Sequence, residues 1–171
     1  MNMKNFFVQQ MAMYSAYHKD GRNQLTHYIG VPSIVLSLFI AFSWIDLFTL
    51  NGFQVTFAML FVAVVLLFYL VSDFVIGLIS AILFIPLLQL SMQVAPTADL
   101  AGWAWFAVLF VGGWIFQLVG HVFEGRKPAL VDNLFQIFMA PSFLVAEALF
   151  HLGLRQDLQA QISRRTADYA A

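Results

Sequence analysis

The residues of this sequence best suited to chemistry are its four histidines, His18, His27, His121 and His151. The neutral imidazole ring is the commonest metal ligand in proteins. Because the sequence contains no cysteine, thiolate metal sites, Fe–S clusters and thiol nucleophiles are excluded. Imidazoles combined with carboxylates suit Fe(II), Zn, Mn or Cu, and two or three histidines with an acid are typical of non-haem Fe(II) oxygenases.

The spacing of the histidines indicates whether they share a site. His18 and His27 are nine residues apart, so one continuous helix would point them in opposite directions. The turn predicted at Asp20-Gly21 lets both rings face one site from different elements. A single histidine at the end of a membrane helix is equally well explained as an interfacial residue. Three of them beside several acids favour a shared site.

The richest polar stretch of the chain runs from Gln117 to Asn133. Gln117, His121 and Glu124 follow the spacing i, i+4, i+7 and therefore form one polar stripe on an otherwise apolar helix. A histidine and a carboxylate one turn apart can share a metal ion, or the carboxylate can orient the imidazole. Arg126 and Lys127 are able to bind a carboxylate or phosphate group, although both also suit routine anchoring at the membrane surface.

The composition places these residues in a helical membrane protein. Of 171 residues, 61% are hydrophobic and only 10% are charged, against roughly 25% charged in soluble domains. The mean hydropathy is +0.83. The net charge of −1 and the scattered basic residues provide no basic face for a nucleic acid. We therefore expect one membrane domain over residues 1–171, all-α, with no nucleic-acid partner.

Four stretches approach the length of about 20 apolar residues that a membrane-spanning helix needs. They are Val31–Phe48, Phe53–Val71, Phe74–Val94 and Ala101–Gly120. A fifth stretch, Leu134–Leu152, contains Pro141 and Glu147, and is predicted to be a re-entrant or bundle-packed helix, with a fifth simple span as the alternative. Asn5 to His18 is predicted to form an amphipathic helix at the interface.

The basic residues predict the topology. None of the eight lies in the three short breaks between the four stretches. Four spans place the N-terminus and the loop at 121–132 on one side, which the distribution of Lys and Arg assigns to the cytoplasm. On this topology all four histidines lie at segment ends on that side.

These residues resemble the fungal 2-hydroxy fatty acid dioxygenase family and its bacterial relatives. The resemblance covers about half of the chain in two blocks, and Ser33 to Ala101 matches only in being hydrophobic. The matching residues are Tyr17-His18, Asn23, His27, Pro32, Trp114-Ile-Phe-Gln117, Gly120-His121, Phe123-Glu124, Pro128-Ala-Leu130, Asp132-Asn133-Leu134, Gln136, Ala140-Pro141, Phe143 and Glu147.

The resemblance implies an integral membrane enzyme that uses Fe(II) and O2 to shorten a 2-hydroxy fatty acid by one carbon, releasing CO2. In fungi this activity serves sphingolipid breakdown in the endoplasmic reticulum, and a bacterial inner membrane is the alternative location. The implied iron ligands are His18, His27 and His121, whereas His151 falls where the family does not require histidine. We expect a catalytic or orienting carboxylate among Glu124, Asp132 and Glu147, and substrate contacts from Arg126, Gln117 and Asn133.

Two other functions remain open at this stage. A non-enzymatic lipid-binding or transport protein would use Asp46, Asp73 and Glu147 as its polar pathway, but the middles of the predicted spans contain few polar residues. A haem protein would use His27 and His121 as axial ligands. The metal content of the protein distinguishes the first alternative, and its visible absorption distinguishes the second.

Overall fold

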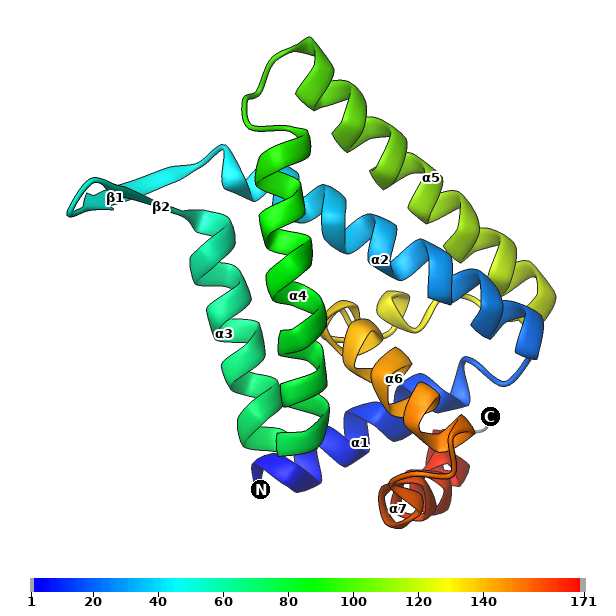
Figure 1. Cartoon of the computed structure of the whole chain (residues 1–171). Coiled ribbons are helices and arrows are strands. Elements are labelled where there is room, and N and C mark those ends of the chain that lie inside the picture. Colours follow the sequence, from blue (N-terminus) through cyan, green and yellow to red (C-terminus); the bar gives the residue numbers. More distant parts are fainter. Residues whose placement is uncertain (1, 170–171) are drawn as a thin grey trace.

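The computed structural model describes residues 2–169 as a helical bundle with one β-hairpin (Figure 1). Its helices are α1 Met3–Ala16, α2 Gly21–Ser43, α3 Phe57–Ser72, α4 Phe74–Val94, α5 Leu100–Glu124, α6 Gln136–His151 and α7 Gln156–Thr166. The strands are β1 Asp46–Leu50 and β2 Phe53–Thr56, and two short 3-10 helices are η1 Ala129–Val131 and η2 Ala167–Tyr169. The prediction of an all-α fold is confirmed, with the hairpin as an unpredicted addition.

Helices α2, α4 and α5 are long and apolar enough to cross a membrane. A fourth candidate is the pair α6 and α7, which is bent by 118° at the break between them. The stretch predicted as a span at Phe53–Val71 forms the 16-residue helix α3, which is shorter than the about 20 residues that a span needs. The predicted helical bundle with several helices able to span a membrane is therefore confirmed, but α3 does not meet the length of a span.

The first predicted span, Val31–Phe48, is wrong at its C-terminal end. The helix α2 ends at Ser43, and Asp46–Leu50 forms a strand that pairs antiparallel with β2. Asn51 and Gly52 both adopt positive φ angles, 50° and 81°. Two consecutive residues of this kind make the type I′ turn that joins β-strands with the correct twist. The break predicted at Asn51-Gly52 therefore exists, but it is a hairpin turn.

Helices α2 and α5 run antiparallel and pack side by side (Figure 1). Glycines allow this close approach: a Cβ atom on Gly30 would lie 2.8 Å from the carbonyl oxygen of Gly113. Gly120 faces Asn23 and His27 in the same way, nearer the start of α2. The first turns of α2 are consequently held against the last turns of α5.

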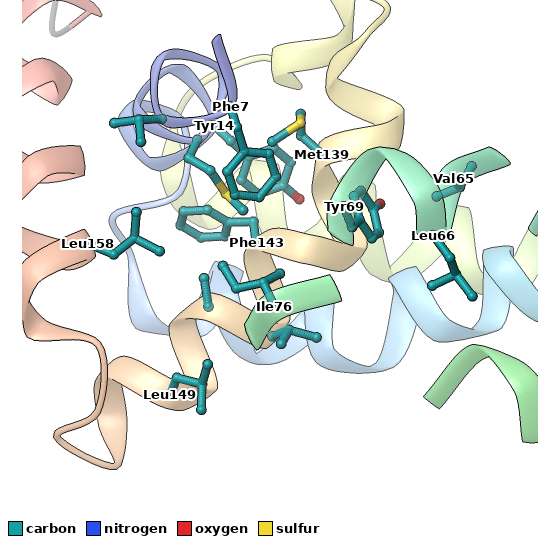
Figure 2. Packing of buried hydrophobic residues seen from close by; sticks show 14 of the residues in the cluster. Phe7, Tyr14, Val65, Leu66, Tyr69, Ile76, Met139, Phe143, Leu149 and Leu158 are labelled. Carbon is teal, nitrogen blue, oxygen red and sulfur yellow. The ribbon is translucent and has the colours of Figure 1, made fainter. Parts of the chain in front are cut away.

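The remaining helices pack around a common hydrophobic core. Figure 2 shows Tyr14 of α1 and Phe143 of α6 close to Met139, with Tyr69 of α3 and Ile76 of α4 beside them. The Tyr69 hydroxyl donates a hydrogen bond to the carbonyl oxygen of Phe138, which ties α3 to α6. Helix α6 is continuous through Pro141, although a proline inside a helix removes a backbone hydrogen bond.

A partly buried ion pair connects the α3–α4 corner to the start of α7. Asp73 caps α4 by accepting a hydrogen bond from the Ile76 amide at 3.1 Å. The same carboxylate accepts two hydrogen bonds from the Arg155 guanidinium, at 2.7 and 2.6 Å. This bidentate geometry fixes the position of α6 and α7 relative to the bundle.

Candidate metal centre

Three elements bring three of the four histidines together. His18 lies in the short connection between α1 and α2, His27 in the second turn of α2, and His121 in the last turn of α5. The Asp20 side chain caps α2 by accepting from the Arg22 amide, so the chain turns between His18 and His27 as predicted. The antiparallel pairing of α2 and α5 then places His121 opposite His27.

The three imidazoles form a compact, buried cluster. One ligand nitrogen from each ring lies within 4.8 Å of the others. The ring centroids are 4.6 Å apart for His18 and His27, and 5.1 Å apart for each of these with His121. Every ring is less than 8% exposed to solvent. The predicted convergence of His18, His27 and His121 is therefore present, whereas His151 is exposed at the end of α6.

The hydrogen bonds of His18 and His27 leave a metal-binding nitrogen on each ring. Nδ1 of His18 lies 2.7 Å from the Tyr14 carbonyl oxygen, and Nδ1 of His27 lies 2.9 Å from the Asn23 carbonyl oxygen. A carbonyl oxygen only accepts, so Nδ1 carries the proton and Nε2 of the neutral ring keeps its lone pair. The two Nε2 atoms are 3.1 Å apart.

Two lone pairs at this distance repel each other unless a proton or a cation lies between them. Two nitrogens bound at right angles to one metal ion, each at about 2.1 Å, are about 3.0 Å apart. The spacing of the two Nε2 atoms fits a shared ion. Nδ1 of His121 is also buried and has no hydrogen-bond partner within residues 2–169. The donor set, three neutral nitrogens without sulfur, suits Fe(II) as well as Zn.

Tyr14 holds the His18 ring in place. The two rings are stacked with centroids 3.9 Å apart and an interplanar angle of 6°. Burial lowers the pKa of the His18 imidazole well below its usual range, and the proximity of His27 lowers it further. His18 is therefore neutral at physiological pH, and the neutral form is the one that binds a metal.

Glu124 does not face the histidine cluster. Its carboxylate accepts hydrogen bonds from the backbone amides of Lys19 at 2.9 Å and Asp20 at 2.9 Å, and from Nδ2 of Asn23 at 2.9 Å. These donors surround the start of α2, where partial positive charge favours an anion. Glu124 thus joins the end of α5 to the connection that carries His18.

Three other predicted site residues lie outside the cluster and hold chain segments together. Asp132 accepts from the Tyr17 hydroxyl at 2.6 Å and pairs with Lys127 at 2.5 Å. Arg126 donates to the carbonyl oxygens of Ala16 and Tyr169. Asn133 donates from Nδ2 to Gln10 at 2.9 Å and accepts from the Phe135 amide.

An apolar cavity adjoins the cluster. Its empty space, including the open mouth, is about 840 Å³. Two glutamines line this cavity, as the histidines do, and have unused hydrogen-bonding capacity within the described residues: Nε2 of Gln117 has no acceptor and Oε1 of Gln136 has no donor. Glu147 is also buried with an unpartnered Oε2, but it lines a different cavity together with His151.

The comparisons with known proteins establish the family of the chain. Residues 4–152 match the family model described as 2-hydroxy-palmitic acid dioxygenase Mpo1-like. The chain belongs to this family. It is 34% identical over 155 residues to the 2-hydroxy-palmitic acid dioxygenase MPO1 of Saccharomyces cerevisiae, a match that covers 90% of this chain and 85% of the yeast protein. No solved structure matches the chain. The family resemblance predicted from the sequence is therefore confirmed.

The sequence alone did not indicate a role for two residues that line the same cavity as the histidines, Tyr14 and Gln136. Gln136 belongs to the matching block, but nothing in its local pattern indicated that it lines the same cavity as the histidines. Tyr14 lies four residues before His18, the spacing that brings side chains together on a helix. That spacing was the available signal for the stacked pair, although α1 ends at Ala16.

Proposed function

We propose that this protein is an Fe(II)-dependent dioxygenase that shortens 2-hydroxy fatty acids by one carbon. The observation that carries the proposal is the pair of buried, neutral imidazoles whose Nε2 atoms lie 3.1 Å apart in a chain of the Mpo1-like family. The overall reaction is balanced as 2-hydroxy acid plus O2 giving the shortened acid, CO2 and water. The four electrons that reduce O2 come from the two carbons of the cleaved bond.

His18, His27 and His121 would hold the iron, which when bound supplies the redox chemistry with O2. The protein's own contribution is to position the headgroup of the substrate. The unpartnered Nε2 of Gln117 donates to a carboxylate oxygen, and the unpartnered Oε1 of Gln136 accepts from the 2-hydroxyl group. Glu124 acts as a positioning residue through the backbone around His18.

The cavity beside the histidines would take the acyl tail. Its wall is almost entirely apolar apart from the residues at the histidine end. The cluster lies at the start of α2 and the end of α5, so the site is at one boundary of the membrane, which we propose to be the cytoplasmic one. The geometry argues against the haem hypothesis, because three nitrogens converge on one point and leave no plane for a porphyrin between His27 and His121.

The test is iron content and turnover of the purified protein in lipid. Wild type loaded anaerobically with Fe(II) is expected to bind about one iron per chain and to convert a 2-hydroxy fatty acid to the shortened acid with release of CO2. His121→Ala should lose both iron and turnover. His151→Ala is the matched control, since this exposed histidine lies outside the cluster, and should retain both. Full turnover by His121→Ala would overturn the proposal.

A further inference from the structure

One face of α2 lines the apolar cavity along its length. The α2 residues that line it are His27, Val31, Ile34, Val35, Leu38 and Phe39. Their spacing of i, i+4, i+7, i+8, i+11 and i+12 is one face of a helix over more than three turns. The cavity therefore begins at the metal ligands and runs along α2 toward the middle of the span.

The length of this face corresponds to an acyl chain of definite size. His27 and Phe39 are twelve residues apart, which is about 18 Å along a helix. A fully extended chain of single bonds advances about 1.2 Å per bond, judged from backbone dimensions. The face between the metal ligands and Phe39 therefore spans about 15 bonds.

Two aromatic rings stand at the far end of the cavity. Phe39 of α2 and Phe84 of α4 are 1% and 6% exposed, and their ring centroids are 5.6 Å apart in an edge-to-face arrangement. Tyr69 of α3 packs against Phe84 with centroids 6.3 Å apart. Because its hydroxyl is bonded to the Phe138 carbonyl, Tyr69 links this wall to α6. The wall is therefore part of the packed core.

We propose that Phe39 and Phe84 form the end wall of the acyl site and set an upper limit of about 16 carbons for the fatty acid. This inference rests on the proposed function. The limit is steric. A tail too long for the cavity keeps the carboxylate and hydroxyl groups from reaching Gln117, Gln136 and the histidines. Since a methylene that does not fit a pocket changes turnover by about tenfold or more, the limit should be sharp.

The experiment compares 2-hydroxy fatty acids shorter than, equal to and longer than about 16 carbons. For wild type we expect kcat/KM to fall about tenfold or more beyond the limit. Phe39→Ala and Phe84→Ala should restore the longer substrates. Phe7→Ala is the matched control, because Phe7 is 1% exposed in the core but does not line the cavity.

Replacing a cavity-lining residue with a larger one should shorten the acyl site instead of lengthening it. This test does not depend on how the alanine variants fold. Val35 lies eight residues from His27 on the cavity face, about 12 Å along the helix. Val35→Phe should therefore lower the limit to about 11 carbons. Length profiles in Val35→Phe, Phe39→Ala and Phe84→Ala that equal the wild-type profile would overturn the proposal.

A binding measurement separates this inference from the proposed function. Trp114 lines the cavity, so simple fatty acids brominated near the chain middle should quench its fluorescence in metal-free protein, with Trp114→Phe as the background. Two results together support the acyl site even if no 2-hydroxy acid is consumed. In wild type, quenching should stop at the same chain-length limit, and in Phe39→Ala this limit should move to longer chains. Quenching that ignores chain length in wild type and in Phe39→Ala contradicts it.

Discussion

Replacing Glu124 with glutamine is expected to weaken both the fold and the metal site, although Glu124 is not a ligand in this geometry. The carboxylate accepts from three donors, the amides of Lys19 and Asp20 and Nδ2 of Asn23, all at about 2.9 Å. Glutamine keeps one accepting oxygen and places an NH2 group against the remaining donors. Losing one hydrogen bond to a charged group costs about 1.5–3 kcal/mol. We expect metal-free Glu124→Gln to lose about 2 kcal/mol of unfolding free energy.

The effect on metal binding follows from the position of these donors. The amide of Lys19 directly follows His18, and Asn23 supplies the carbonyl oxygen that orients His27. Loss of such supporting contacts typically lowers metal affinity by about 10- to 100-fold. The assay is denaturant unfolding of the metal-free protein, followed by Fe(II) titration.

Asp46→Asn removes the same charge from the exposed hairpin and serves as the control. Wild-type stability of metal-free Glu124→Gln, together with complete loss of iron, would refute the reasoning and make Glu124 a ligand.

Two further predictions concern other contacts that position the site. Gly30→Ala puts a Cβ atom 2.8 Å from the Gly113 carbonyl oxygen; it should cost about 1–3 kcal/mol in denaturant unfolding, whereas Gly112→Ala, with nothing within 4 Å, should cost little. Hydrogen bonds from Lys127 and then Tyr17 lower the pKa of Asp132, so its stabilisation is present above the unfolded pKa of about 3.9 and is lost as the pH falls further. Asp132→Asn should therefore be less stable than wild type at neutral pH and equally stable in strong acid, as pH-dependent thermal unfolding would show.

The histidine cluster was predictable because its determinants are local. A turn at Asp20-Gly21 reverses the chain between His18 and His27, and the antiparallel packing of α2 and α5 brings the end of α5 to the start of α2. The stripe of Gln117, His121 and Glu124 was also visible in the spacing. The different roles of these three residues were not visible, because they depend on how α5 is rotated against α2.

The hairpin and the cavity were missed for different physical reasons. Leu47, Phe48 and Leu50 continue the apolar run of α2, so hydropathy alone extends the helix through them. The Asn51-Gly52 pair that specifies a type I′ turn was read only as a break. The cavity requires side chains from α2, α3, α4, α5 and α6 to leave space between them, and this is a property of packing that periodicity does not contain.

The arrangement of the cavity accounts for how a fatty acid derivative would reach the histidines. His27 lies near the start of α2 and His121 near the end of α5. In the proposed function these histidines would therefore lie close to one membrane boundary, and the apolar wall would extend from them into the depth of the span. A fatty acid in the bilayer has the same order, with its carboxylate at the boundary and its tail in the hydrocarbon layer. Such a substrate can enter the cavity sideways without turning over or leaving the membrane, and its headgroup then arrives at the level of the histidines. Under the proposed function, a water-soluble 2-hydroxy acid would have no tail to fill the apolar wall, so the site would select amphiphiles by the depth at which their polar groups lie.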